Sequence, residues 1–440
     1  MIKLQAAASP SFLERFFHIQ ERGSTVGREV IAGVATFMTM AYILFVNPDM
    51  LSTIGIPAEG AAVATALAAA LTTLAMGLYA NYPFALAPGV GLSSALVFGL
   101  AAGQKIPWQV GMGVIFIEGL IVTVFVLTNI REQVMEAIPL NLKRAIGAGI
   151  GLFIAFIGLK NAGLVVDHPA TLVTYGSVLN KGALLSIIGL LLTAALMSRR
   201  IPGAILLGIL LTTVIGIPLG LTHLPSTWLR VPGAGSFTTF FQLDIAGALR
   251  LALLSSIFAF LMTDFFDTMG TVVAIGEEAG LLKDGKLPGL KRVLLVDSLS
   301  AMVGALFGTS SVTTYVESAA GVAQGGRTGL ASVTTSLLFL IAVFFAPLIG
   351  IVPTEATAPA LIIVGFLMLA AIKDIPFHDF GEAFPAFVTL ITIPLTFNIA
   401  RGIGYGFIAY VIIKLLTGEA RRVHPLLWAT SVLFLISFVI

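Results

Sequence analysis

The sequence predicts an all-α integral membrane protein with about fourteen transmembrane segments in a 7+7 inverted repeat. Hydrophobic residues make up 58% of the chain, charged residues only 10%, and the mean hydropathy is +1.03; soluble domains carry roughly a quarter of charged residues. Apolar runs long enough to cross about 30 Å of hydrocarbon recur along the whole chain. Two of them are interrupted at corresponding places in the two halves, a pattern typical of secondary transporters.

Twelve uninterrupted spans are expected, six in each half. The first six lie near residues 28–46, 59–79, 108–128, 142–159, 182–198 and 202–219. The second six lie near residues 246–271, 292–307, 328–349, 358–372, 383–398 and 402–417. Before them, Phe12, Phe16 and Phe17 predict a short amphipathic helix at the membrane surface. After them, the apolar residues 425–440 form either an extra span or an interfacial helix.

The third and tenth segments, near residues 83–102 and 309–326, are the interrupted ones. Each contains a stretch rich in Gly, Pro, Ser and Thr, at residues 87–95 and 309–321. Backbone that cannot complete a helix is tolerated at membrane depth only where protein or a water-filled cavity satisfies its polar groups. These two stretches are therefore the expected binding region.

The Lys and Arg residues favour one orientation. With a cytoplasmic N-terminus, 18 of the 24 Lys and Arg residues fall on the cytoplasmic side and the other 6 fall outside. Such an excess on the cytoplasmic side is the usual arrangement. We therefore expect a multi-pass protein of the cell membrane, in contact with lipid. The sequence leaves open whether it forms a homodimer.

Four carboxylates are expected within the membrane. Glu118 lies in the middle of a span, Asp264 and Asp267 lie toward the later part of the eighth span, and Glu317 directly follows the second interruption. A charge at the centre of a bilayer helix costs at least about 2.5–3.5 kcal/mol, so each is a functional candidate. All four are candidates for proton coupling, because burial disfavours the charged form of a carboxyl group. Asp264 and Glu118 have a structural alternative, a hydrogen bond to neighbouring backbone.

Ser93 and Ser94 occupy the place in the first interruption that matches Glu317 in the second. After two glycines, their hydroxyl and N–H groups are expected to form a neutral hydrogen-bonding corner. The alternative is that small residues allow tight helix packing there. Phe266 and Tyr315 are candidates for a flat apolar wall against a planar ligand.

Several motifs, taken in order, closely resemble those of the AzgA-like purine permeases, a branch of the nucleobase–ascorbate transporter (nucleobase:cation symporter-2) group. They stand at residues 38–48, 77–89, 264–271 (Asp-Phe-Phe-Asp-Thr-Met-Gly-Thr), 313–321 (Thr-Thr-Tyr-Val-Glu-Ser-Ala-Ala-Gly) and 325–329. The resemblance extends from about residue 24 to about residue 417.

The resemblance implies a core domain and a gate domain, each contributed by both halves. The core comprises residues 28–130 and 241–350, and the gate comprises residues 131–240 and 351–440, after a cytoplasmic segment at residues 1–27. It also implies elevator-like uptake of adenine, guanine or hypoxanthine, coupled to a proton in preference to sodium, and short antiparallel strands in the two interrupted segments. The residues implied at the substrate are Asp267, Glu317, Ser93, Ser94, Thr268, Thr314, Tyr315 and Phe266.

One motif departs from the family pattern. The family commonly reads Pro-Gly-Met-Gly-Leu-Asn-Ala, whereas this chain reads Pro-Gly-Val-Gly-Leu-Ser-Ser at residues 88–94. Ser93 thus replaces an amide that both donates and accepts hydrogen bonds. We expect a gap beside Ser93, and expect Ser93→Asn to tighten purine binding.

Other functional classes fit less well. An anion exchanger or uniporter on the same architecture is the main alternative, and a Lys or Arg in the binding region would favour it. A channel would require a pore lined by several subunits, and the internal repeats within one chain argue against it. No enzyme, metal or cofactor is expected: the chain has no Cys, its five His residues lie outside the expected spans, and it lacks an ATP-binding Gly-rich motif. The net charge of +2 predicts no nucleic-acid partner.

Overall fold

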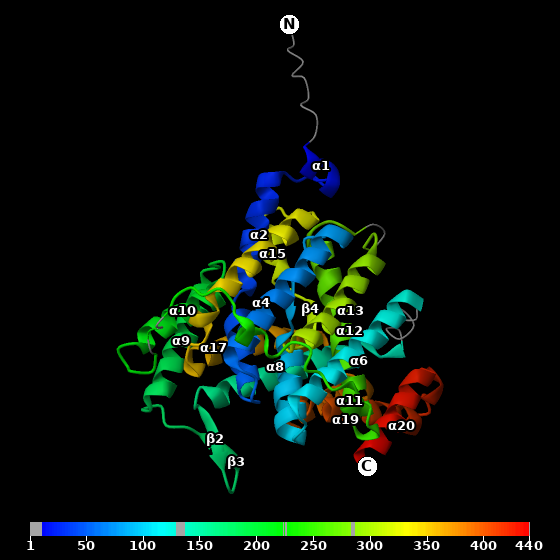
Figure 1. Cartoon of the computed structure of the whole chain (residues 1–440). Helices are drawn as coiled ribbons and strands as arrows, with labels where there is room; N and C mark the ends of the chain where they lie inside the picture. Colours follow the sequence, from blue (N-terminus) through cyan, green and yellow to red (C-terminus); the bar gives the residue numbers. More distant parts are fainter. Residues whose placement is uncertain (1–10, 129–136, 223, 225–226, 283–286, 440) are drawn as a thin grey trace.

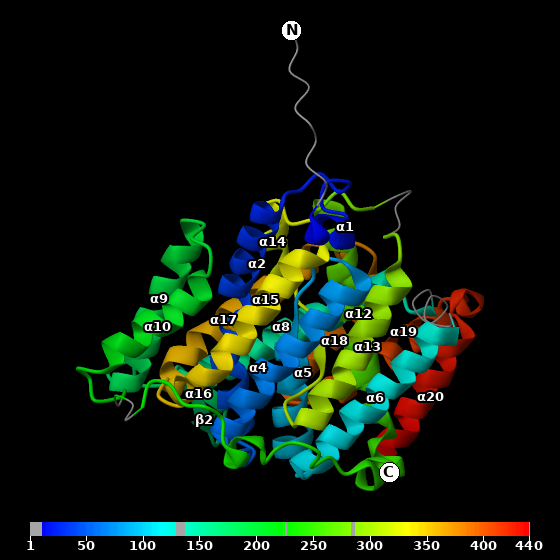
Figure 2. The ribbon, with the colours of Figure 1, turned by 45° about the horizontal axis from the view of Figure 1, so that its top comes forward.

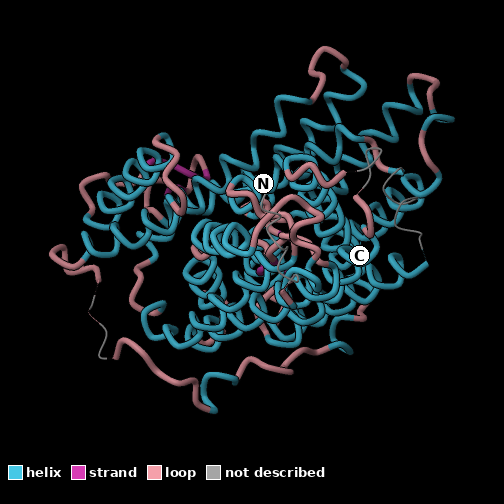
Figure 3. Tube along the Cα trace, turned by 90° about the horizontal axis from the view of Figure 1, so that it is seen from above, coloured by secondary structure: helices cyan, strands magenta, loops and turns pink. Residues whose placement is uncertain are grey.

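The computed structural model describes residues 11–128, 137–222, 224, 227–282 and 287–439, and this part of the chain is mostly helical (Figure 1). Nine of the helices described are long and apolar enough to cross a membrane, and shorter apolar helices lie between them. Helices α9 and α10 lie at one edge of the molecule and α20 at the opposite edge (Figures 1 and 2). Figure 3 shows helices throughout, with the strands as short segments.

The first half begins with a surface helix, α1 (Phe12–Phe17). Phe12 and Phe16 stack on each other and are exposed, as expected for an interfacial helix. The uninterrupted spans follow as α2 (Val26–Met40), α3 (Ile43–Ser52), α4 (Ala58–Ala75), α6 (Trp108–Thr128), α8 (Leu140–Asn161), α9 (Lys181–Ser198) and α10 (Ala204–Gly216). The first expected span comprises α2 and α3, which together form one apolar span, Val26–Ser52, with Tyr42 as the N-cap of α3.

The second half contains α11 (Ile245–Ala248), α12 (Leu254–Glu278), α13 (Leu290–Phe307), α15 (Gly329–Ala342), α16 (Ala346–Ile349), α17 (Thr354–Leu369), α18 (Phe380–Thr396), α19 (Ile399–Leu416) and α20 (Pro425–Val439). The expected bounds of the eighth span, residues 246–271, are wrong. Short helical turns occupy residues 245–253, so the long helix α12 starts later and runs further. Asp264 and Asp267 therefore lie near its middle.

The two interrupted segments meet in a two-stranded antiparallel sheet. Strand β1 (Leu86–Pro88) pairs with β4 (Val312–Thr314), with Ala87 opposite Thr313 at the centre. A half-helix follows each strand: α5 (Val90–Ser94), continued by the π-helical segment η2 (Ala95–Gly103), follows β1, and α14 (Ser318–Ala323) follows β4. Strands are possible at this depth because each satisfies the backbone of the other.

A second pair of corresponding elements is α8 and α17. Each begins after a proline N-cap, Pro139 and Pro353 respectively, and the two helices pack on each other. They approach closely at Gly151 and Gly365: a Cβ added to Gly151 would lie 2.7 Å from the carbonyl oxygen of Gly365. Small residues permit such close backbone contact between membrane helices. Paired features of this kind are what two inverted repeats predict.

The helices group into two sets by their contacts. One set contains α8, α17, α18 and α19, and the other contains α2, α4 and α15 with α6 and α13. Helix α20 packs on α19 and α12, where the buried Phe434 meets Phe407 and Phe258. A hairpin of β2 (Val165–His168) and β3 (Leu172–Tyr175) projects from the lower edge in Figure 1.

Candidate functional site

Glu317 is held at the start of the second half-helix. It is the N-cap residue of α14, as expected from the sequence. The Tyr42 hydroxyl donates a 2.7 Å hydrogen bond to Glu317 Oε1, and the Thr39 hydroxyl lies 3.3 Å from the Glu317 carbonyl oxygen. The break between α2 and α3 therefore positions this carboxylate, which remains partly exposed.

Asp267 lies on the accessible part of one face of α12. Asp267, Gly270, Ala274 and Glu278 follow each other at intervals of three or four residues, and all are exposed. Toward the other end of the helix the same face is buried. Asp267 is therefore accessible from the Glu278 end of α12.

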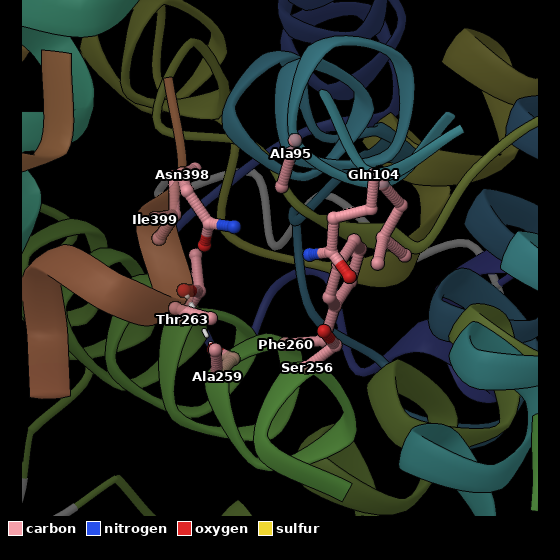
Figure 4. Close-up of a pocket in the computed structure, with 11 residues that line it drawn as sticks. Ala95, Gln104, Ser256, Ala259, Phe260, Thr263, Asn398 and Ile399 are labelled. Atoms are coloured by element: carbon pink, nitrogen blue, oxygen red, sulfur yellow. Dashed lines mark hydrogen bonds between the residues drawn. The ribbon is translucent and has the colours of Figure 1, made fainter. Parts of the chain in front are cut away.

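A small pocket marks the buried end of this face. Ser256, Phe260 and Thr263 of α12 line it together with Gln104 and Asn398, which approach it from opposite sides (Figure 4). Its free volume is only about 10 Å³, roughly that of one water molecule. It contains neither Asp267 nor Glu317, and it is too small for an organic ligand. The path to Asp267 along this face of α12 is therefore closed at the Ser256 end of the helix.

Asp297 of α13 joins the eighth span to strand β4. Its Oδ1 accepts hydrogen bonds from the Thr314 backbone N–H, at 3.0 Å, and from the Thr314 hydroxyl, at 2.8 Å. Its Oδ2 accepts a 2.7 Å bond from the Thr268 hydroxyl, which also lies 2.8 Å from the Thr313 hydroxyl. Asp297 is fully buried. Thr268 and Thr314, both expected at the site, are therefore oriented by one carboxylate.

Asp297 was not among the predicted site residues, although the sequence contains a signal for it. Asp297 lies within the expected span at residues 292–307, so it is an intramembrane carboxylate like Glu118. The same energetic argument therefore applies to it. Tyr42 and Asn47 were also missed, although both stand in the motif at residues 38–48 that carries the family resemblance.

Ser93 and Ser94 do not occupy the place that matches Glu317. Glu317 is an N-cap residue, whereas the N-cap of α5 is Gly89 and both serines lie within the helix. The Ser93 N–H bonds to the Gly89 carbonyl oxygen, and the Ser94 hydroxyl donates to the Val90 carbonyl oxygen. The prediction that these N–H and hydroxyl groups form a free hydrogen-bonding corner is therefore wrong, because they bond within the helix.

The expected gap beside Ser93 is absent as well. Ser93 is 0% exposed, and its hydroxyl donates a 2.7 Å hydrogen bond to Asn47 Oδ1. Asn47 Nδ2 in turn donates to the hydroxyls of Thr65 and Thr309, each at 2.8 Å. Ser93 is thus part of a buried polar network that connects the two interrupted segments through α3 and α4.

Tyr315 also connects the two interrupted segments. Its hydroxyl donates a 2.6 Å hydrogen bond to the Pro88 carbonyl oxygen, and its N–H bonds to the Ala85 carbonyl oxygen at 2.9 Å. Only 5% of Tyr315 is exposed. Its ring therefore stabilises the sheet and presents little free surface to a ligand. The Phe266 side chain lies outside the described part of the structure.

Glu118 and Asp264 lie deeper in the protein than Asp267. Both are fully buried, Glu118 in the middle of α6 and Asp264 in α12, and these two helices pack against each other. Within the described residues, no group of three or more His, Asp or Glu side chains is arranged to hold a metal ion. The accessible chemistry is therefore that of hydrogen-bond acceptors on Asp267 and Glu317, next to hydroxyl groups.

Comparison with known proteins decides the family. The xanthine/uracil permease model, described as a permease family, matches residues 27–405. The chain belongs to this permease family. It is 43% identical to the guanine/hypoxanthine permease PbuG of Bacillus subtilis over 439 residues, which cover 97% of this chain and 99% of that protein. It is 42% identical to the adenine permease AdeP of Escherichia coli over 428 residues, 97% of this chain and 96% of that protein.

A solved structure shares the fold of this permease. The transmembrane domain of the cyanobacterial bicarbonate transporter BicA superimposes with a TM-score of 0.62, covering 88% of this chain and 97% of that domain at 16% identity. Similarity at this level concerns the fold alone. The family resemblance seen in the motifs is confirmed, and the permease is a transporter rather than an enzyme.

Proposed function

We propose that this permease takes up purine nucleobases, namely adenine, guanine or hypoxanthine, by proton symport. The observation that carries the proposal is a pair of accessible carboxylates: Asp267 on α12, which packs against both half-helices, and Glu317 at the start of α14. A nucleobase is planar and neutral, with N–H donors and ring acceptors on its edges. Carboxylate oxygens accept from the N–H groups. The names of PbuG and AdeP support the same substrate class.

The other residues differ in how directly they act on the base in this proposal. Thr268 and Thr314 contribute hydroxyls whose orientation Asp297 sets. Ser93 acts through Asn47 rather than directly on the base. Tyr315 braces the strands beside the site, and the Ser94 hydroxyl is used within α5. Phe266 remains a candidate from the family resemblance alone.

Proton coupling is proposed for the intramembrane carboxylates Asp267, Glu317, Asp264 and Glu118. Asp264 and Glu118 are fully buried on two helices that pack together, whereas Asp267 is accessible. A proton that enters at Asp267 or Glu317 is therefore next to the substrate. A proton is proposed in preference to sodium as the coupling ion, as the family resemblance implies.

The transport cycle is proposed to be elevator-like, within fourteen segments in two inverted repeats. The core comprises residues 28–130 and 241–350, and the gate comprises residues 131–240 and 351–440. The two sets of packed helices support this division. Asp267 is reachable from one end of α12 and closed off from the other, as one state of an alternating-access cycle requires.

The N-terminus and the Glu278 end of α12 are proposed to be cytoplasmic, which makes this state inward-open. The distribution of Lys and Arg supports this orientation. Because the chain has no Cys, single cysteines in the predicted loops that contain residues 199–200 and residues 283–292 test it. An impermeant thiol reagent should not label either loop from outside intact cells, and labelling of either one would reverse the orientation.

Anion exchange is the second candidate, because the bicarbonate transporter shares the fold. The α12, α5 and α14 sequences contain no Lys or Arg, and two carboxylates repel an anion. Uptake of radiolabelled purines into cells expressing the permease separates the two functions. Purine accumulation that a protonophore stops supports the proposal; bicarbonate exchange without purine uptake would replace it.

A further inference from the structure

A second pocket lies where α8, α19 and α20 meet, and it shares no residue with the proposed purine site. Its volume is about 330 Å³. Arg421, Arg422 and His424 line its polar side, and Pro139, Val423 and Leu427 line its apolar side. The pocket therefore combines cationic groups with an apolar surface.

Among the described residues around this pocket, positive charges outnumber negative charges. Lys414 Nζ lies 3.1 Å from Glu382 Oε1 and 2.9 Å from Glu419 Oε2, so it pairs with both carboxylates. Arg422 also pairs with Glu419 at 2.6 Å. The hydrogen bond from Lys414 holds the pKa of Glu419 below its ordinary value, so that carboxylate stays ionised. Arg421 makes no ion pair with any residue that the structure describes. Among the side chains that the structure describes there, three cationic groups thus lie beside two carboxylates.

The surroundings of the pocket are those of a membrane boundary. Leu415 and Leu416 at the end of α19 and Leu140 at the start of α8 are exposed to the outside of the protein. Trp428 stands in the first turn of α20, and Trp is enriched at the level of lipid headgroups. A ligand with an anionic head and apolar tails matches both halves of this environment.

We propose that this pocket binds the phosphate group of an anionic phospholipid, with Arg421 and Arg422 as its cationic ligands. Basic pockets between transmembrane helices commonly bind such headgroups on the cytoplasmic side. The lipid would bridge α8, α19 and the start of α20. Because α20 also packs on α12 through Phe434, the bound lipid anchors this C-terminal helix against both α19 and α12.

Native mass spectrometry of the purified full chain tests the proposal. Phosphatidylglycerol, cardiolipin and phosphatidylcholine are added in turn to wild type and to R421Q/R422Q. The matched control is R199Q/R200Q, which removes another exposed arginine pair on the same proposed side of the membrane. Inorganic phosphate and glycerol 1-phosphate form a further arm, because they carry the phosphate without the tails.

Wild type and the control should retain the two anionic lipids in preference to phosphatidylcholine, and R421Q/R422Q should lose affinity by roughly fivefold for each arginine. Without lipid, all three proteins should unfold at similar temperatures, because exposed ion pairs contribute little. Equal retention of anionic lipid by R421Q/R422Q and the control would overturn the proposal. So would binding of the soluble phosphates as strong as that of the lipids.

Discussion

Tyr42 and Glu317 are 275 positions apart in the chain, and a 2.7 Å hydrogen bond joins them. Tyr42 stands at the break between α2 and α3, and Glu317 stands at the start of α14. The interruption between α2 and α3 in the first half thus contacts the start of a half-helix in the second half, and the contact is made at the Glu317 carboxylate. The proposed purine site depends on this meeting, since the tyrosine fixes where the carboxylate oxygen lies.

Tyr42→Phe should therefore weaken purine binding while leaving the fold intact. The variant keeps the buried ring and removes only the donor to Glu317. Hydrogen bonds to charged groups contribute about 1.5–3 kcal/mol, so we expect a loss of affinity of roughly tenfold or more. Competition uptake with adenine, guanine and hypoxanthine measures it. Tyr410→Phe, which removes a hydroxyl bonded to Glu382, is the control; equal affinities in the two variants would contradict the role given to Tyr42.

Asp297 should be needed for both folding and transport. Asp297→Ala leaves the Thr314 N–H and the Thr268 hydroxyl without their acceptor, at about 1–3 kcal/mol for each buried donor. We expect a clear drop in the thermal unfolding temperature of the purified protein. Asp297→Asn keeps an acceptor and the side-chain shape, so it should fold but transport poorly. Normal stability of Asp297→Ala would show that these hydrogen bonds are not structural.

Asp49 should hold α3 to α17 on the closed side of the site. Its two carboxylate oxygens accept hydrogen bonds from Thr354, at 3.0 Å, and from Thr357, at 2.7 Å. Asp49→Ala removes both, so states in which the closed side opens should gain population, by tenfold or more if about 1.5 kcal/mol is lost.

Thiol labelling measures this shift in the Cys-free chain. A cysteine at Thr263, which is buried on the closed side, should react faster in the Asp49→Ala background. A cysteine at the exposed Gly270 should react readily in both backgrounds and serves as the control. An unchanged rate at position 263 would mean that Asp49 does not restrain the closed side.

Alanine substitutions at Gly151 and Gly147 of α8 should have different effects on the unfolding temperature. A Cβ at Gly151 would collide with the Gly365 carbonyl oxygen, whereas a Cβ at Gly147 meets nothing within 4 Å. Gly151→Ala should therefore lower the unfolding temperature by forcing α8 and α17 apart. Gly147→Ala should leave it unchanged or raise it, by up to about 1 kcal/mol of stability. Identical behaviour of the two variants would disprove the close crossing.

Hydropathy located most of the helices correctly, because a membrane span needs a minimum apolar length. It misplaced α12, since the apolar residues 246–253 form short turns that a hydropathy pattern does not distinguish from a span. It also did not reveal the interruption between α2 and α3, because the apolar pattern runs through it without a change.

The candidate site was predictable in its charges but not in its hydrogen bonds. Asp267 and Glu317 stand out in an apolar sequence because an intramembrane charge is costly. The partner of Ser93 is Asn47, and the partners of Asp297 are Thr268 and Thr314. These partners come from other segments, so only the folded arrangement shows that Ser93 is already satisfied.

Uptake of radiolabelled purines by Glu317→Gln and Asp267→Asn shows whether transport needs the two carboxylates. Each variant keeps the side-chain shape and removes the ability to carry a negative charge or to exchange a proton. Wild type should accumulate adenine, guanine or hypoxanthine, and a protonophore should stop it. Both variants should reach the membrane in normal amounts and fail to accumulate purine, and Glu118→Gln should be impaired less completely. If both amide variants concentrate purine at the wild-type rate, the carboxylate site proposed for this permease is wrong.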